Sequence, residues 1–286
     1  GMVAEESAAD LRRPEGKALR ERVTEVVNRA LAGVYEGTRL TADEVMDAID
    51  RGATEGGPTG RHWILDPIDG TKGFINGRQY AIALALMEEG VVTGGVLGCP
   101  NMPWERIPSG ATEIPTATPG CLFIASQGQG VMVTPMDAEE PLGVNAVRAE
   151  TAKVTDSSEA TYMESWGDSI AADYEFTQSL SDAMGIKTRP VRIDSQAKYA
   201  ALSRGDTNMY LRFPPKTYRE KIWDHAAGAA MVQEAGGIIS DGSGKPLDFS
   251  KGRFLDIEDG IVASSTPALH AKLVEMIKYV ASQAHK

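Results

Sequence analysis

The stretch Leu65-Asp66-Pro67-Ile68-Asp69-Gly70-Thr71 follows an expected strand at residues 62–65 and is the most informative part of this chain. Proline disfavours helical backbone at the residue before it, and glycine permits a tight reversal, so the strand should end in a compact turn. Such a turn aims the carboxylates of Asp66 and Asp69 and the carbonyl of Ile68 at one point. These hard oxygen ligands suit magnesium, and the Thr71 hydroxyl is placed to orient a metal-bound water. A turn that merely caps the next segment explains the same residues equally well.

Two further carboxylate motifs lie far from this turn in the sequence. Glu5-Glu6 follows the apolar residues 2–4, and taken alone it is typical of a solvated charge pair. Asp224 opens an expected helix near residues 224–235, where aspartate is a good N-cap. Because a helix N-terminus also attracts anions, a carboxylate there can share a metal ion and a phosphate.

The rest of the chain changes character near residue 145. The first part predicts a helix that buries one face between Leu19 and Leu31, a capping box at Thr41 and Glu44, and a hairpin that turns at Glu89-Gly90. The second part predicts helices near 169–184, 195–203, 224–235 and 267–282, with strands near 190–193, 208–213, 237–240 and 260–264. We therefore expect an α/β fold with a sheet-rich metal-binding part at 1–145 and an α/β substrate-binding part at 146–286.

Composition narrows the function classes. The 286 residues carry a formal net charge of −11, which argues against nucleic acid as a partner. The longest apolar run, residues 81–87, is far too short to cross a membrane. An acidic protein can still act on polyanions if bound cations reverse the local field.

The two cysteines, Cys99 and Cys121, exclude a disulfide-rich scaffold and favour a reducing compartment. They end and begin strands that can be neighbours in an antiparallel sheet. Two buried thiols and a reversible, regulatory disulfide both remain open.

The three carboxylate motifs, VAEES (3–7), LDPIDGT (65–71) and WDHAAG (223–228), occur in the order typical of the lithium-sensitive, magnesium-dependent phosphatases of the inositol monophosphatase superfamily. The chain resembles one branch in particular, the plant-like 3'(2'),5'-bisphosphate nucleotidases. The stretches 55–74, 191–206, 210–214, 218–228 and 234–252 carry this likeness. It implies a layered αβαβα sugar-phosphatase-like sandwich.

The resemblance also implies roles for individual residues. The implied magnesium ligands, for two or three ions, are Glu5, Asp66, Ile68 through its carbonyl, Asp69 and Asp224. Thr71 and Asp69 would be catalytic. The implied substrate-binding residues are Gly70, Thr71, Ser195, Lys198, Arg212, Asp224 and, by a loose match, Tyr174.

Two departures from the family pattern accompany this likeness. The family begins with two helices that precede the Glu-Glu strand and contribute a further aspartate, whereas this chain starts at that strand. We expect the missing helical layer to leave apolar surface exposed. A family histidine that contacts adenine has Tyr174 as its nearest equivalent here.

The resemblance implies hydrolysis of adenosine 3',5'-bisphosphate to AMP and phosphate, with phosphoadenylyl sulfate and inositol 1,4-bisphosphate as further candidate substrates. An inositol monophosphatase-type enzyme and a non-catalytic nucleotide-binding protein are the alternatives. We expect a soluble, intracellular monomer, cytoplasmic or in a plastid or mitochondrion, that binds a small phosphorylated nucleotide and neither nucleic acid nor membrane.

Overall fold

The computed structural model describes residues 1–35, 37–108, 110–167, 169 and 173–283, and its first sheet follows from alternating apolar residues. Along β3, Ala81, Ala83 and Ala85 are buried while Leu84 and Leu86 face the other side. β1 pairs parallel with β2, and every other pairing in this sheet is antiparallel. The strand order is β1 (Met2–Ala4), β2 (Arg61–Asp69), β3 (Ala81–Glu88), β4 (Val91–Cys99), β5 (Cys121–Ser126), β6 (Gly130–Pro135) and β7 (Val147–Ala149).

A second, mixed sheet is built from the later part of the chain. Its central strand β10 pairs antiparallel with β12 and parallel with β8. The order is β11 (Ile238–Asp241), β12 (Ile261–Ser264), β10 (Met209–Arg212), β8 (Tyr162–Glu164) and β9 (Val191–Arg192). Strands were predicted near all of these positions except β8.

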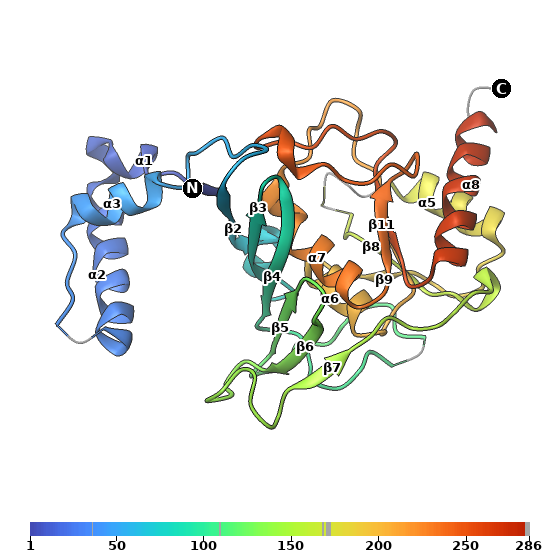
Figure 1. Cartoon of the computed structure of the whole chain (residues 1–286), viewed down its shortest axis with the longest axis horizontal. Coiled ribbons are helices and arrows are strands. Elements are labelled where there is room, and N and C mark those ends of the chain that lie inside the picture. Colours follow the sequence, from blue (N-terminus) through green and yellow to red (C-terminus); the bar gives the residue numbers. More distant parts are fainter. Residues whose placement is uncertain (36, 109, 168, 170–172, 284–286) are drawn as a thin grey trace.

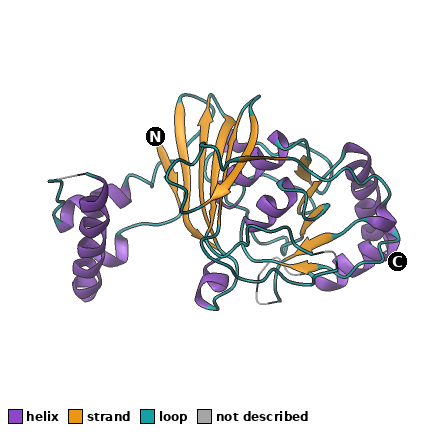
Figure 2. Cartoon of the chain, turned by 90° about the horizontal axis from the view of Figure 1, so that it is seen from below, coloured by secondary structure: helices purple, strands orange, loops and turns teal. Residues whose placement is uncertain are grey.

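Helices α6 (Ala197–Ser203) and α7 (Ala226–Glu234) lie between the two sheets, and α5 (Tyr174–Met184) and α8 (Pro267–Gln283) cover the far side of the second sheet (Figures 1 and 2). Small residues let α7 approach closely: a Cβ on Gly228 would lie 1.9 Å from the ring of Tyr199 on α6. The layers follow one another as sheet, helices, sheet and helices. This order confirms the expected sandwich without its first helical layer. Short 3₁₀ turns occupy Pro14–Gly16 (η1), Ser157–Glu159 (η2), Ile222–Asp224 (η3) and Phe249–Lys251 (η4).

The segment between β1 and β2 forms a separate helical unit beside the body (Figure 1). It contains α1 (Ala9–Arg12), α2 (Lys17–Val34) and α3 (Ala42–Asp50), around a small cluster centred on Ala8, Val45 and Met46. The predicted capping box at Thr41 and Glu44 is present. α2 has no fully buried residue, because only one side of the helix has a partner.

The outer face of the first sheet is open. Trp63 and Ile82 are 42% and 40% exposed, and the strand registers place Trp63 beside Leu86 and Leu84 beside Val96. We define the open sheet face as Trp63, Leu65, Ile82, Leu84, Leu86, Val96, Leu122, Ile124 and Met132. The expected exposed apolar surface is therefore found on the sheet. Across the described ranges, every helix falls short of the length and apolar character that a membrane crossing requires.

β7 lies beyond the boundary predicted near residue 145, yet it pairs with β6 of the first sheet. Helix α7, from the second part, packs on β3 and β4 of the first part. The division into parts 1–145 and 146–286 stays a prediction.

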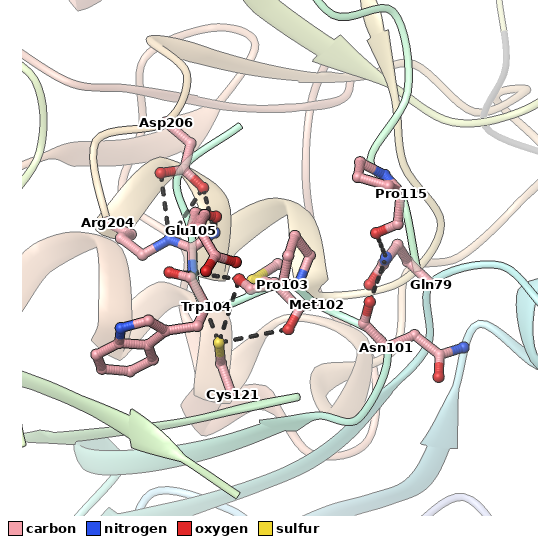
Figure 3. A network of polar contacts seen from close by, with 10 residues as sticks. All are labelled: Gln79, Asn101, Met102, Pro103, Trp104, Glu105, Pro115, Cys121, Arg204 and Asp206. Carbon is pink, nitrogen blue, oxygen red and sulfur yellow. Dashed lines mark hydrogen bonds and ion pairs between the residues drawn. The ribbon is translucent and has the colours of Figure 1, made fainter. Parts of the chain in front are cut away.

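The two cysteines are directly opposite each other on β4 and β5, and both are free and fully buried. The Cys121 thiol donates to the carbonyls of Met102 and Pro103, both at 3.4 Å (Figure 3). Arg204 holds the same loop from above, since its Nη1 donates to the Pro103 carbonyl at 2.8 Å while Nη2 pairs with Asp206 at 2.6 Å. Burial raises the pKa of both thiols.

Candidate active site

The carboxylate turn closes the end of β2 where its register with β3 shifts between Asp66 and Asp69. Asp66 is 1% exposed, and its Oδ1 accepts a hydrogen bond from the Ile68 amide at 3.0 Å. This bond satisfies one oxygen and leaves the other available to a ligand. The turn therefore has the local bonding of an aspartate turn, yet it also aims carboxylates into a pocket.

Gly70 is required where this turn meets the loop before α6. Its φ of 81° is left-handed, and a Cβ there would lie 2.7 Å from the Cβ of Ser195. Ser195 is itself in the left-handed region, at φ 65°. The close approach lets the Gln196 amide donate to Asp69 Oδ2 at 2.5 Å.

Gln196 also brings Asp224 to the turn. Its side-chain Nε2 donates to the Trp223 carbonyl at 2.8 Å, and its Oε1 accepts from the Gly228 amide at 3.0 Å. Helix α7 begins at Ala226 and has no side-chain cap, so Asp224 does not serve as the N-cap. The alternative interpretation of the sequence, in which Asp224 is only a helix N-cap, is therefore wrong.

Three carboxylates converge as a result. Single oxygens of Asp66, Asp69 and Asp224 all lie within 4.8 Å of one another. Glu5, one residue beyond β1, raises the pKa of the Asp66 carboxyl further. Sequence motifs separated by more than 150 residues thus form one acidic cluster.

The electrostatics of this cluster fit a bound cation. Burial and then the neighbouring carboxylates raise the pKa of Asp66 to about 10. Burial raises the pKa of Asp69 to about 6, and burial together with Asp69 raises that of Asp224 to about 6. Carboxylates that repel one another in a buried site are stabilised by a hard divalent ion with oxygen ligands.

Thr71 and the Ile68 carbonyl are joined by a hydrogen bond. The Thr71 hydroxyl donates to the Ile68 carbonyl at 3.4 Å, and Thr71 begins the short helix α4 (Thr71–Ile75), which the sequence did not predict. Both predicted groups are therefore on the same turn as Asp66 and Asp69.

A cavity of about 310 Å³ opens from the cluster and joins the two parts of the chain. Six predicted substrate-binding residues line it: Gly70, Thr71, Ser195, Lys198, Arg212 and Asp224. Further lining residues that had no predicted role include Lys72, Asp194, Gln196, Tyr199 and Tyr210. Gln196 lies within the 191–206 stretch that carried the resemblance, so its sequence context was noticed while its role was missed.

Two cationic side chains, Lys198 and Arg212, line the same cavity as Asp69 and Asp224. Lys198 donates through Nζ to the Ile193 carbonyl at 2.8 Å, and burial lowers its pKa to about 8. Arg212 ends β10 and is held by Glu220 through two hydrogen bonds of 2.6 and 2.8 Å. The cavity therefore contains carboxylates that suit a cation and cationic side chains that suit an anion.

Tyr174 is placed differently from the other predicted residues. It does not line the cavity; its hydroxyl donates to the Ser165 carbonyl at 3.0 Å, and its ring packs against Arg192. Ser165, in contrast, does line the cavity. Residues 168 and 170–172 of the predicted adenine-contacting segment lie outside the described residues.

The chain matches the inositol monophosphatase family over residues 6–281. A 3'(2'),5'-bisphosphate nucleotidase of Oryza sativa is 46% identical over 283 residues, which cover 97% of this chain and 77% of that protein. The 3',5'-bisphosphate nucleotidase 2 of Arabidopsis thaliana is 43% identical over 268 residues, which cover 92% of this chain and 74% of that protein.

Among solved structures, 2'-AMP-bound SaIMPase-II matches with a TM-score of 0.58 and 17% identity over 94% of this chain and 90% of that one. The IMPase of Thermotoga maritima matches with a TM-score of 0.56 and 22% identity over 92% and 83%.

The two-sheet sandwich matches the fold of these IMPase structures. The chain belongs to the inositol monophosphatase family.

Proposed function

We propose that this chain is a magnesium-dependent phosphomonoesterase that hydrolyses adenosine 3',5'-bisphosphate to AMP and phosphate. The observation that carries the proposal is the cavity lined by Asp69, Asp224, Lys198 and Arg212, with Asp66 completing the carboxylate cluster beside it. A divalent ion and two cationic side chains together suit a substrate with two phosphate groups. Nucleotidases that are more than 40% identical over most of the chain support the choice of an adenine nucleotide.

Each residue has a proposed task. Asp66, Asp69, Asp224, Glu5 and the Ile68 carbonyl would hold two or three magnesium ions, and bound ions would supply Lewis-acid chemistry toward the phosphoryl oxygens and the attacking water. Thr71 and Asp69 orient that water toward phosphorus.

The remaining residues bind the nucleotide. Lys198 and Arg212 attract the second phosphate, and the backbone at Gly70 and Ser195 lies close enough to the turn to contact the substrate. Tyr174 would contribute by supporting Ser165, because its own ring is occupied by Arg192.

The test is phosphate release from adenosine 3',5'-bisphosphate and from inositol 1-phosphate, with and without magnesium. We expect faster release from the nucleotide, inhibition by lithium, and a loss of at least a hundredfold in Asp69→Asn. Asp248→Asn, at an exposed turn outside the cluster, is the matched control and should keep its rate.

Different results support the alternatives. Faster cleavage of inositol 1-phosphate would favour the inositol monophosphatase-type enzyme. Nucleotide binding without any magnesium-dependent release would favour a non-catalytic binding protein. Equal release by wild type and Asp69→Asn would refute the metal assignment.

A further inference from the structure

A row of buried polar side chains lies directly behind Arg212. Glu220 is fully buried and grips the guanidinium at two points, from Nε to Oε1 at 2.6 Å and from Nη2 to Oε2 at 2.8 Å. His225 Nε2 lies 3.0 Å from the same Oε2, and the Tyr199 hydroxyl lies 2.8 Å from His225 Nδ1. The row therefore runs from the middle helices of the sandwich to the wall of the cavity.

The contacts of this row fix Arg212 at its charged end. A guanidinium can only donate, so both oxygens of Glu220 accept from Arg212. His225 lies between the Glu220 carboxylate and the Tyr199 hydroxyl, with one ring nitrogen in contact with each. Each group orients the next, which leaves Arg212 little rotational freedom.

Both ends of the row, Tyr199 and Arg212, line the substrate cavity, and Arg212 is the end that carries a positive charge. Glu220 engages two of its five N–H donors and the Tyr210 hydroxyl also hydrogen bonds to it, so at least two donors remain for a ligand. A guanidinium fixed in advance loses less entropy when it binds a phosphate than a mobile one does. Burying the ion pair between Arg212 and Glu220 is costly. The pair is explained because it fixes the orientation of the Arg212 guanidinium.

We propose that Glu220, braced by His225 and Tyr199, is a positioning residue that holds Arg212 to grip the phosphate that the enzyme does not cleave. This inference rests on the proposed function, because it assumes a substrate with two phosphates. Glu220 does not contact the reacting atoms and acts through Arg212 alone. Its loss should therefore change affinity for the retained phosphate more than it changes the chemical step.

The kinetic test compares adenosine 3',5'-bisphosphate with 3'-AMP, which lacks the 5'-phosphate, in wild type and Glu220→Gln. We expect KM for the bisphosphate to rise at least tenfold, kcat to change less than threefold, and KM for 3'-AMP to stay within threefold. Arg212→Lys should show the same pattern. The double variant should be little worse than either single variant, because both changes remove one interaction.

A matched control removes another buried carboxylate that pairs with arginine. Asp206→Asn breaks the pair with Arg204 beside Cys121, outside the cavity. This variant should lose thermal stability without changing the ratio of KM values for the two substrates. If Glu220→Gln behaves in the same way, or if it lowers kcat equally on both substrates, the positioning role is wrong.

A binding measurement separates this inference from the proposed function. AMP keeps the 5'-phosphate and needs no turnover, so its affinity is measured by calorimetry against that of adenosine. Glu220→Gln should weaken AMP binding about tenfold and leave adenosine unchanged. That result in a protein without phosphatase activity would keep the positioning role and refute the activity. If Glu220→Gln leaves AMP binding unchanged and the protein is an active phosphatase, the positioning role is wrong and the proposed function stands.

Discussion

Asp66, Asp69 and Asp224 hold their protons more tightly in the folded protein than ordinary carboxylates do, because burial and mutual repulsion oppose ionisation. Between an unfolded pKa near 4 and folded values of about 6 or above, the folded state binds more protons. Stability of the metal-free protein therefore falls as pH rises through this window. A divalent ion bound to these carboxylates should offset their mutual repulsion and so reverse this loss of stability.

The first prediction concerns this pH dependence. In EDTA, the midpoint of thermal unfolding should fall from pH 5 to pH 7, by an amount equivalent to roughly 1.3 kcal/mol for each of Asp69 and Asp224. With magnesium the midpoint should rise, and the gain should grow with pH because the ion competes with protons. Differential scanning calorimetry at several pH values measures both trends.

Substitution sharpens this test. Asp224→Asn should raise the metal-free midpoint at pH 8 and reduce the gain from magnesium, whereas Asp248→Asn should leave that gain intact. If magnesium raises the unfolding midpoint equally at pH 5 and pH 8, the ion does not compete with protons at these carboxylates and the prediction is wrong.

The second prediction concerns the cysteines. Cys99 and Cys121 face each other across β4 and β5, but both are buried and burial raises both thiol pKa values. Because the thiolate is the reactive species, we expect iodoacetamide to label them at least a hundredfold more slowly in the native than in the unfolded protein. Arg204→Ala should speed labelling of Cys121, since Arg204 holds the loop above it.

Mass spectrometry after timed labelling measures these rates. Rapid native labelling, or protection of both thiols from labelling after mild oxidation, would favour the regulatory disulfide that the sequence left open.

At the scale of elements, α6 and α7 bring together the segments that carry the site. The third prediction tests their close approach. Gly228→Ala would place a Cβ 1.9 Å from the Tyr199 ring and should destabilise the protein by about 2 kcal/mol or more. Because the helices would have to separate, activity should fall as well. Urea unfolding and phosphate release measure the two effects.

Gly33 offers a matched control for this substitution. It also lies within a helix, α2, and a Cβ there meets nothing within 4 Å. Gly33→Ala should therefore be neutral or stabilise by up to about 1 kcal/mol, without any effect on activity. Equal effects of the two substitutions would show that helix propensity, rather than packing, decides the outcome at Gly228.

At the scale of the whole molecule, the open sheet face sets the behaviour in solution. Nine apolar side chains from five neighbouring strands form a contiguous surface of a kind that monomers rarely expose. The fourth prediction is that this chain binds a hydrophobic dye strongly. Leu86→Lys, beside Trp63 on this face, should reduce dye fluorescence severalfold.

A solvent-exposed loop residue provides the control. Val144→Lys replaces an apolar side chain that stands alone outside the sheet, so it should leave dye binding unchanged. Sedimentation at several concentrations tests the predicted monomer at the same time. Concentration-dependent association that Leu86→Lys abolishes would show that the open face pairs molecules instead.

The sequence by itself determined the local turns and the family. Pro67 and Gly70 dictate the carboxylate turn through backbone sterics, and Thr41 and Glu44 define a helix start. The apolar run at 81–87 before the turn at Glu89-Gly90 identifies a hairpin. All three signals arise between residues close in the chain. The ordered motifs then pointed to five oxygen ligands.

Only the tertiary structure decided which residues serve that site from a distance. Gln196 ties Asp69 to the loop of Asp224, and Glu220 holds Arg212 from eight residues away through a reversal of the chain. Tyr174 turned against Arg192 rather than into the cavity. Such contacts depend on how helices and sheets pack, because hydrogen bonds between distant segments leave no periodic signal in the sequence.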